Sequence, residues 1–288
     1  MAPSHRTGRL TNHDEMHLFA IRGFPPGHLR VWCPSGDFDM DTIAGKRQAD
    51  DGLSANSLST CDAMWLGLEQ WLDRDFEVDG VFYLSYPVGE TGGELGMLFD
   101  RAIFHVTYPR AYMESLSDNP LANDRPAEIV LTEKTPCRWH APATWEGASE
   151  AQRATRAKDV ALGMEVGLCI PLLSEAGHVS GGFGLRHRHQ DAARFDALLA
   201  ARMDDLLDGL HDFDRRFRGP FARATFALSA QETRVLSHVA GGMSVLRAAH
   251  QMNLSPKTVE AYLATIRRKT RSQSTAEAVA KAIFFHLV

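Results

Sequence analysis

The helix-boundary signals in residues 228–288 constrain the fold of this chain more than any other feature of its sequence. Ser229 and Glu232 have the spacing of a capping box, in which each side chain binds a free backbone amide at a helix start. Gly241-Gly242 ends that helix, and Ser255-Pro256 supplies an N-cap and a first-turn proline for another. These signals predict a compact set of short helices.

The helix that starts at Pro256 and runs to about Lys269 has two different faces. Its apolar residues are spaced to form one buried stripe: Val259, Leu263 and Ile266. The other face is basic or small: Lys257, Thr258, Ala261, Ala264, Thr265 and Arg268. A shorter helix, Val245–Met252, precedes it across the turn at residues 252–254. A helix with such an outer face is one that the major groove of DNA can admit, and its first amides, with Ser255 and Thr258, suit a phosphate.

The succession Leu-Ser-x-x-Glu, Gly-x-Ser, Ala-Ala, Leu-Ser-Pro-x-Thr-Val-Glu, Leu-x-x-Ile-x-x-Lys and Glu-Ala-Val resembles the LuxR-type (GerE-like) helix-turn-helix from residue 228 to about 282. The resemblance implies DNA contacts, to phosphates from Lys257, Thr258, Arg267, Arg268 and Lys269 and to bases from Glu260, Ala261 and Ala264. Two positions depart from the family. Arg271 stands where a glycine usually ends the recognition helix, and Thr275 where a basic residue is common.

Charge divides the chain into an acidic body and a basic end. Residues 228–288 hold eight Lys and Arg against three Asp and Glu, a net charge of +5. Because the whole chain carries −5, the other 227 residues carry −10. This distribution favours a sensor or regulatory body joined to a nucleic-acid-binding module, although an ordinary solvated surface could also produce it.

The body follows the order helix, hairpin, helices, hairpin, helix. The expected strands are 81–86 with 97–106, around a glycine-rich turn at 89–96, and 165–173 with 179–187. This order predicts an α+β domain, an α/β/α sandwich around an antiparallel sheet, followed by an all-α, four-helix C-terminal domain.

Breaker residues define the expected domain boundaries. Residues 1–57 are interpreted as an N-terminal extension that need not be fully ordered, and residues 58–218 as a sensor domain. A long helix from Asp191 to about Phe217 is expected to end at Arg218-Gly219-Pro220. Residues 219–227 would then be a linker, with the DNA-binding domain at 228–288.

The body also resembles the autoinducer-binding domain of LuxR-type quorum-sensing regulators. The motifs that carry this resemblance are Tyr108-Pro109-Arg110-Ala111-Tyr112, Arg125-Pro126, Trp139 and Gly167-Leu168-Cys169-Ile170-Pro171-Leu172. The resemblance implies a cavity between the sheet and one helical layer that holds an acyl-homoserine lactone. A Trp would bond the lactone carbonyl, an Asp the amide N–H and a Tyr the acyl carbonyl.

The polar groups of that pocket are altered in this chain. Tyr108 and Trp139 are retained, but Tyr112 replaces the lactone-binding Trp, Leu116 replaces a Tyr, and Arg125 replaces the Asp, with Asp124 one residue early. A buried ligand N–H without an acceptor costs roughly 1–3 kcal/mol. A helix shift that turns Asp124 inward would restore one contact. Arg125 would suit a carboxylate or another anion, or would simply be solvated.

Other function classes lack support in the sequence. The chain has 288 residues, 44% hydrophobic and 23% charged, and no run of 18 apolar residues or secretory signal, so a cytoplasmic bacterial protein is expected. Cys33, Cys61, Cys137 and Cys169 are interpreted as reduced thiols. We find no metal spacing among the histidines and no set of nucleophile and base, and therefore expect no metal, no cofactor and no enzymatic activity.

The sequence predicts a transcription regulator that binds double-stranded DNA as a homodimer. Two recognition helices related by a two-fold axis would read an inverted repeat, with half-sites about 34–36 Å apart. The favoured version acts without a standard acyl-homoserine lactone or with a different small ligand. One alternative is a lactone-responsive quorum-sensing regulator, and another is an anti-activator that forms heterodimers with a related regulator. RNA polymerase is a further candidate partner, and a membrane is not.

Overall fold

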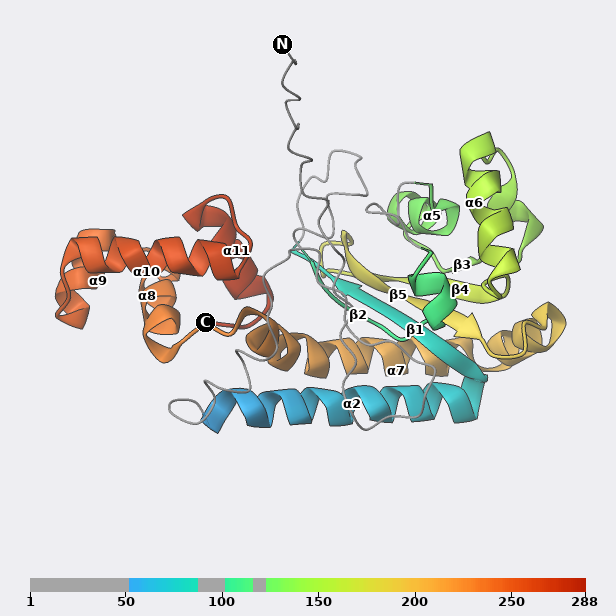
Figure 1. Ribbon diagram of the computed structural model, residues 1–288, viewed down its shortest axis with the longest axis horizontal. Coiled ribbons are helices and arrows are strands. Elements are labelled where there is room, and N and C mark those ends of the chain that lie inside the picture. The colour runs from blue at the N-terminus through green and yellow to red at the C-terminus, as the bar shows by residue number, and fades with distance from the viewer. Residues whose placement is uncertain (1–51, 88–101, 116–122) are drawn as a thin grey trace, which may run out of the picture.

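A computed structural model describes residues 52–87, 102–115 and 123–288 (Figure 1). The elements of the N-terminal domain are α2 (Gly52–Phe76), β1 (Val78–Ser85), β2 (Ile103–Val106), α4 (Arg110–Met113), α5 (Arg125–Glu133), β3 (Cys137–Arg138), a 3-10 helix (Pro142–Trp145), α6 (Glu150–Ala161), β4 (Gly167–Leu173), β5 (Val179–His187) and α7 (Ala192–Phe226). The C-terminal elements are α8 (Ala230–Ala240), α9 (Val245–Met252), α10 (Pro256–Lys269) and α11 (Thr275–Phe284).

The N-terminal domain is built on a five-stranded sheet in the order β2-β1-β5-β4-β3, and all neighbouring strands are antiparallel. Tyr83 of β1 lies opposite His105 of β2 on one side and Phe183 of β5 on the other. The expected α/β/α arrangement around an antiparallel sheet is therefore confirmed. The glycine-rich turn expected at residues 89–96 and most of residues 1–57 lie outside the described residues.

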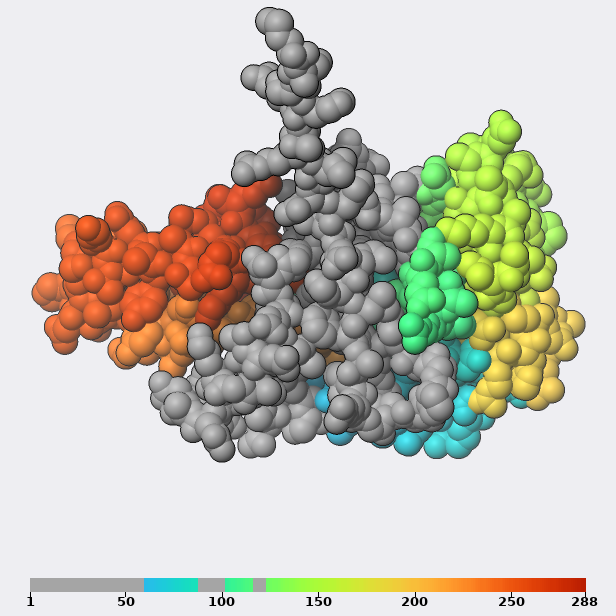
Figure 2. All heavy atoms as spheres, viewed as in Figure 1, coloured from blue at the N-terminus to red at the C-terminus, as the bar shows by residue number. Residues whose placement is uncertain are grey.

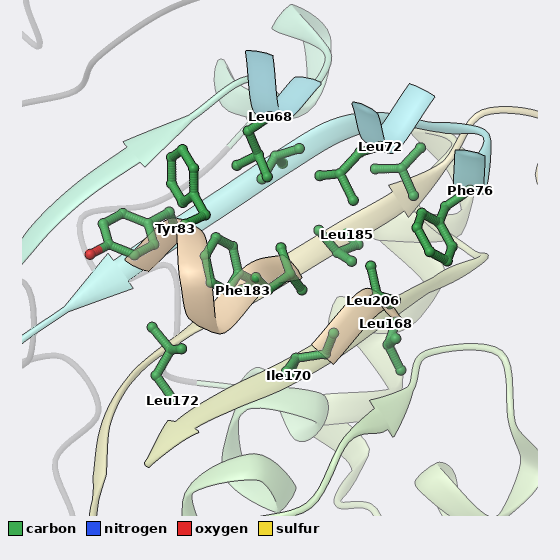
Figure 3. Close-up of a cluster of buried hydrophobic side chains, with 14 of the residues drawn as sticks. Leu68, Leu72, Phe76, Tyr83, Leu168, Ile170, Leu172, Phe183, Leu185 and Leu206 are labelled. Atoms are coloured by element: carbon green, nitrogen blue, oxygen red, sulfur yellow. The ribbon is translucent and has the colours of Figure 1, made fainter. Parts of the chain in front are cut away.

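One face of the sheet packs against α2 and α7, and the other faces α5 and α6 (Figure 1). Because alternate strand residues point to opposite faces, Tyr83, Leu168 and Phe183 point into the core against α2 and α7. Figure 3 shows this core, in which Leu68, Leu72 and Phe76 of α2 and Leu206 of α7 meet the strand side chains. Their neighbours in the strands, such as Phe82 and Cys169, face α5 and α6 and line a cavity.

Helix α7 does not end where the sequence predicted. It continues for 35 residues to Phe226, through Pro220, with helical geometry interrupted only at Arg202. An internal proline costs a helix about 3 kcal/mol. Burial of Phe217 and Phe226, each about 1.5–3 kcal/mol, offsets that cost. The expected break at Arg218–Pro220 is therefore wrong, and most of the residues expected to form a linker lie in this helix.

Helix α7 joins the two domains through contacts at its C-terminal end. The guanidinium of Arg218 lies 4.6 Å from the ring centroid of Phe284 in α11. The Arg223 side chain donates a 2.7 Å hydrogen bond to the carbonyl of His286. Ile103 of β2 and Phe226 belong to the same buried cluster as the C-terminal helices. These helices form a lobe at one end of the molecule, orange and red in Figure 2.

A carboxylate is buried inside the N-terminal core beside this junction. Asp214 of α7 is 3% exposed, accepts a 2.7 Å hydrogen bond from the Tyr83 hydroxyl and forms an ion pair with Arg218. Burial, followed by the nearby negative charge of Asp214, raises the pKa of Tyr83 well above its ordinary value, so the phenol remains a donor. The side chain of Arg218 is 18% exposed, which leaves the pair largely shielded from water.

We predict that Arg218→Ala lowers the free energy of unfolding by about 3–5 kcal/mol, because it leaves a buried carboxylate without its counter-charge. Urea denaturation followed by circular dichroism measures this loss. Arg216→Ala is the matched control, since Arg216 pairs with Asp212 on the surface and its side chain is 66% exposed. The control should change stability by less than about 1 kcal/mol. Equal effects of the two substitutions would show that the Asp214 pair has no special role.

Candidate nucleic-acid interface and ligand cavity

Helices α9 and α10 form a helix-turn-helix. Asn253 ends α9 in the left-handed conformation with φ 55°, and Ser255 caps α10 two residues later. Ala248 and Ala249 of α9 are completely buried, and their small side chains let α10 approach closely. The same buried cluster includes residues of the other three C-terminal helices: Val235, Leu236, Val259, Leu263, Ile266, Ala278 and Ala282.

Helix α10 presents an exposed face that lies opposite its buried stripe. Lys257, Glu260, Ala261, Ala264 and Arg268 are all exposed, at spacings that keep them on one side of the helix. Two side chains on this face are cationic and two are small. The face can therefore approach a phosphate backbone while the alanines let the helix backbone come close to base edges.

The start of α10 is arranged around two hydroxyls. Ser255 Oγ accepts a 3.1 Å hydrogen bond from the amide of Thr258 and lies 2.8 Å from Thr258 Oγ1. Both residues are held close to the free amides of the first turn, where an anion is favoured by the helix dipole. Thr265, another predicted contact, is half-buried on the same helix.

Some of the predicted DNA-contacting cations are engaged inside the domain. Lys269 Nζ lies 2.8 Å from Glu232 Oε2 and 2.9 Å from the carbonyl of Ala227. Burial alone would raise the pKa of Glu232, but hydrogen bonds from Lys269 and from the Ser229 amide hold it below its ordinary value. Arg267 donates to Thr275 Oγ1 at 3.0 Å. Contacts from Lys269 and Arg267 to DNA stay predictions, and each would compete with these internal bonds.

The two departures from the family pattern have clear structural consequences. Arg271 adopts φ 50°, the left-handed region that favours glycine, directly after the end of α10. Thr275 accepts the hydrogen bond from Arg267. Lys281 is buried, and its ammonium donates to the carbonyls of Thr270 and Arg271, which stabilises the strained segment. The basic count of the C-terminal region therefore overstates the charge that it presents to solvent.

The second candidate site is a cavity between the sheet and the helices α5 and α6. Its volume is about 150 Å³, similar to a cavity that holds a benzene molecule. Aromatic rings form much of its wall, with Phe82 and Tyr108 stacked at 6.2 Å between centroids and Tyr108 edge-on to Tyr112 at 5.7 Å. Gly184 leaves room for Tyr108, since a Cβ there would lie 2.2 Å from the phenol oxygen.

The structure brings most of the predicted pocket residues to this cavity. Tyr108, Tyr112, Asp124, Arg125 and Trp139 all line it, although they come from separate parts of the chain. Leu116 lies outside the described residues. The roles of the five lining residues as ligand contacts stay predictions. Hydrogen bonds within the protein show which of these side chains already have a partner.

Arg125 and Trp139 have partners within the protein. Arg125 lies 3.1 Å from Glu128 and donates to the carbonyls of Thr144 and Glu146. The expectation that Arg125 binds an anion therefore loses support. The indole N–H of Trp139 donates to Cys169 Sγ at 3.1 Å. Burial raises the pKa of Cys169 well above its ordinary value, which keeps it a thiol.

Three acidic side chains, Asp124, Asp159 and Glu165, also line the cavity. Asp124 caps α5 by accepting a 2.9 Å hydrogen bond from the amide of Ala127, and burial raises its pKa to about 6. Asp159 of α6 forms no hydrogen bond or ion pair through its side chain in the described ranges. Burial and then the charge of Asp124 raise its pKa to about 7, against a smaller lowering by Lys158.

Asp159 is one of the cavity-lining residues that the sequence did not predict. Helix α6 has no fully buried residue, so it offers no apolar stripe from which its inner face could be predicted. Its cavity-lining residues, Thr155, Arg156, Asp159 and Val160, nevertheless follow the i, i+1, i+4, i+5 spacing of one helix face. This spacing is the only signal in the sequence of α6 for these residues, and it identifies a cavity-lining face only once the position of α6 is known.

Residues 227–282 match the family model described as bacterial regulatory proteins, luxR family. The C-terminal domain is a LuxR-type helix-turn-helix. The chain thus carries the DNA-binding domain of this family of bacterial regulators, and the predicted resemblance of its C-terminal region is confirmed. The LuxR-type domain includes α8 to α10 and nearly all of α11. A comparison with curated proteins gave no match.

The chain is also similar, at a low level, to several solved structures. Escherichia coli SdiA is 15% identical over 86% of this chain and 96% of its own, with a TM-score of 0.46. SdiA in complex with octanoyl-rac-glycerol is 15% identical over 87% and 97%, with a TM-score of 0.38. The phage VqmA–DPO complex is 19% identical over 43% and 50%, with a TM-score of 0.21. Within the described residues, no helix is both long and apolar enough to cross a membrane.

We predict that Asp159→Asn raises the melting temperature at pH 8 by roughly 2–4 °C, the shift that about 1 kcal/mol gives in a protein of this size. The pKa of Asp159 is raised from 3.8 to about 7 in the folded chain. Between pH 3.8 and about pH 7, the folded state therefore holds a proton that the unfolded state has lost. Stability therefore falls as the pH rises through that window, and the asparagine variant escapes this loss.

Thermal unfolding of both proteins from pH 4 to pH 8 tests this. The advantage of the variant should shrink towards pH 4, where the aspartic acid is protonated and neutral. Asp208→Asn is the control, because Asp208 is exposed on α7 and has no ion pair in the described structure. A difference between wild type and Asp159→Asn that does not depend on pH would contradict the assigned burial of this carboxyl.

Proposed function

We propose that this chain regulates transcription by binding an inverted-repeat DNA site as a homodimer, with a sensor domain that does not require a standard acyl-homoserine lactone. The observation that carries the proposal is the exposed face of α10, on which Lys257 and Arg268 flank Ala261 and Ala264. In two copies related by a two-fold axis, such faces read half-sites about one turn of DNA apart.

Helix α7 supports a regulatory role for the N-terminal domain. It packs against the sheet with Phe213 and Phe217 and against the C-terminal cluster with Ala222 and Phe226. The sheet that forms one wall of the cavity and the helix-turn-helix therefore share one element. A ligand that favours one arrangement of the N-terminal core would bias the position of α10.

The polar groups of the cavity favour a ligand other than an acyl-homoserine lactone, or none. Asp124 already caps α5, and the Trp139 N–H already donates to Cys169. Tyr112 stands where the family has the Trp that bonds the lactone carbonyl. A lactone would therefore have to displace existing hydrogen bonds to satisfy its own amide and carbonyl groups.

Selection of random duplex DNA by the full chain tests the proposal, with and without a mixed panel of acyl-homoserine lactones. We expect the same two-fold symmetric site in both arms. Enrichment only with lactone would establish the quorum-sensing alternative. Failure to select any site, with formation of heterodimers with a related regulator that do not bind DNA, would favour the anti-activator.

We predict that Lys257→Ala weakens binding to all DNA sequences about equally and reduces the slope of log affinity against log salt by about 1, because it removes one phosphate contact. Fluorescence anisotropy at several salt concentrations measures both quantities. Arg215→Ala is the matched control, since Arg215 is an exposed cation on α7 with its side chain 74% exposed. A changed base preference in Lys257→Ala would show that this side chain faces bases.

A further inference from the structure

The cavity beside α6 combines aromatic walls with acidic groups and a tyrosine hydroxyl that has no hydrogen bond within the described residues. Tyr108 is 7% exposed, lines the cavity and has no hydrogen-bond partner for its hydroxyl in the described part of the chain. Asp159 lines the same cavity and is likewise unpaired there. Asp159 is half-buried, so both side chains offer a polar atom to a ligand inside the cavity.

The basic groups of the cavity wall do not neutralise these carboxylates. Arg125 is held by Glu128 and two backbone carbonyls, and the Arg156 guanidinium lies 4.6 Å from the ring centroid of Trp145. Lys158, which lies outside the cavity lining, donates to the carbonyl of Ser115. Neither arginine forms an ion pair with Asp124 or Asp159 among the described residues, and a third carboxyl, Glu165, also lines the cavity.

The negative charge of both carboxyls acts inside the cavity. Burial first, and then Asp159 and Asp124 among other neighbours, raise the pKa of Tyr112 well above its ordinary value. Burial, then Cys169 and Tyr112, and after them the same two carboxyls raise the pKa of Tyr108 well above its ordinary value. A positive charge placed among these groups would be attracted by the carboxylates and by the faces of the aromatic rings.

We propose that the cavity binds an amine, a molecule with an apolar ring and a protonated nitrogen that pairs with Asp159 and donates to the Tyr108 hydroxyl. The ring would lie among Phe82, Tyr112 and Trp139 in a space of about 150 Å³. This inference rests on the part of the proposed function that gives the N-terminal domain a small ligand, and it names the chemical class of that ligand.

Thermal unfolding of the full chain tests the proposal with two amines, phenethylamine and cyclohexylmethylamine, and with phenethyl alcohol and hydrocinnamate as neutral and anionic counterparts. At pH 8 we expect the amines to raise the melting temperature, by about 5–10 °C when the amine concentration is about one hundred times its Kd. The alcohol and the carboxylate should leave it unchanged. The amine response should weaken at pH 5.5, because protonation of Asp159 removes the counter-charge.

Two variants separate a specific site from general binding. Asp159→Asn should abolish the response to amines, and Asp208→Asn, on the exposed side of α7, should retain it. Calorimetric titration of wild type and both variants with phenethylamine gives the affinities directly. The dependence of wild-type affinity on pH provides an independent test if Asp159→Asn does not fold.

The proposal is overturned if neither amine binds, if phenethyl alcohol binds as tightly as phenethylamine, or if Asp159→Asn responds like wild type. These outcomes are distinguishable from failure of the proposed function. A chain that selects a symmetric DNA site but ignores amines would contradict this inference alone. A chain that binds amines but selects no DNA would contradict the regulatory role alone.

Discussion

The buried ion pair of Asp214 and Arg218 is the constraint on which the arrangement of this molecule depends. An ionised carboxyl inside an apolar core is stable only when hydrogen bonds and a counter-charge surround it. Tyr83 supplies the hydrogen bond from β1, and Arg218 supplies the charge from the next turn of α7. Arg218 also lies over the ring of Phe284 in α11. The contacts of Asp214 and Arg218 therefore link the sheet, α7 and the C-terminal domain.

Helix α7 therefore connects the domains as a packed element. Its residues beyond Arg202 are helical up to Phe226, and each of its last turns buries a side chain in one of the two cores. A helix anchored in this way transmits a change at either end better than a flexible linker does. Under the proposed function, this shared packing would couple the cavity to DNA binding.

The two candidate sites have opposite electrostatic character. The exposed face of α10 presents Lys257 and Arg268, whereas the cavity presents Asp124 and Asp159. Part of the negative charge of the N-terminal body is therefore located at the cavity, where carboxyl groups and aromatic rings line the same wall. The basic end has a smaller outward charge than its composition indicates, because Lys269 and Lys281 bond within the domain.

The sequence by itself determined the helix-turn-helix and the order of strands and helices apart from the short strand β3. Caps at Ser229 and Ser255 and the stripe of Val259, Leu263 and Ile266 act through residues close in the chain, so local rules suffice. Tertiary structure alone decided that α7 continues through Pro220 and that Asp159 meets Asp124 in one cavity. Both features depend on packing against residues that are distant in the chain. The energy of that burial outweighs the local cost of Pro220 in α7, and the periodicity of α6 alone does not reveal that it faces Asp124.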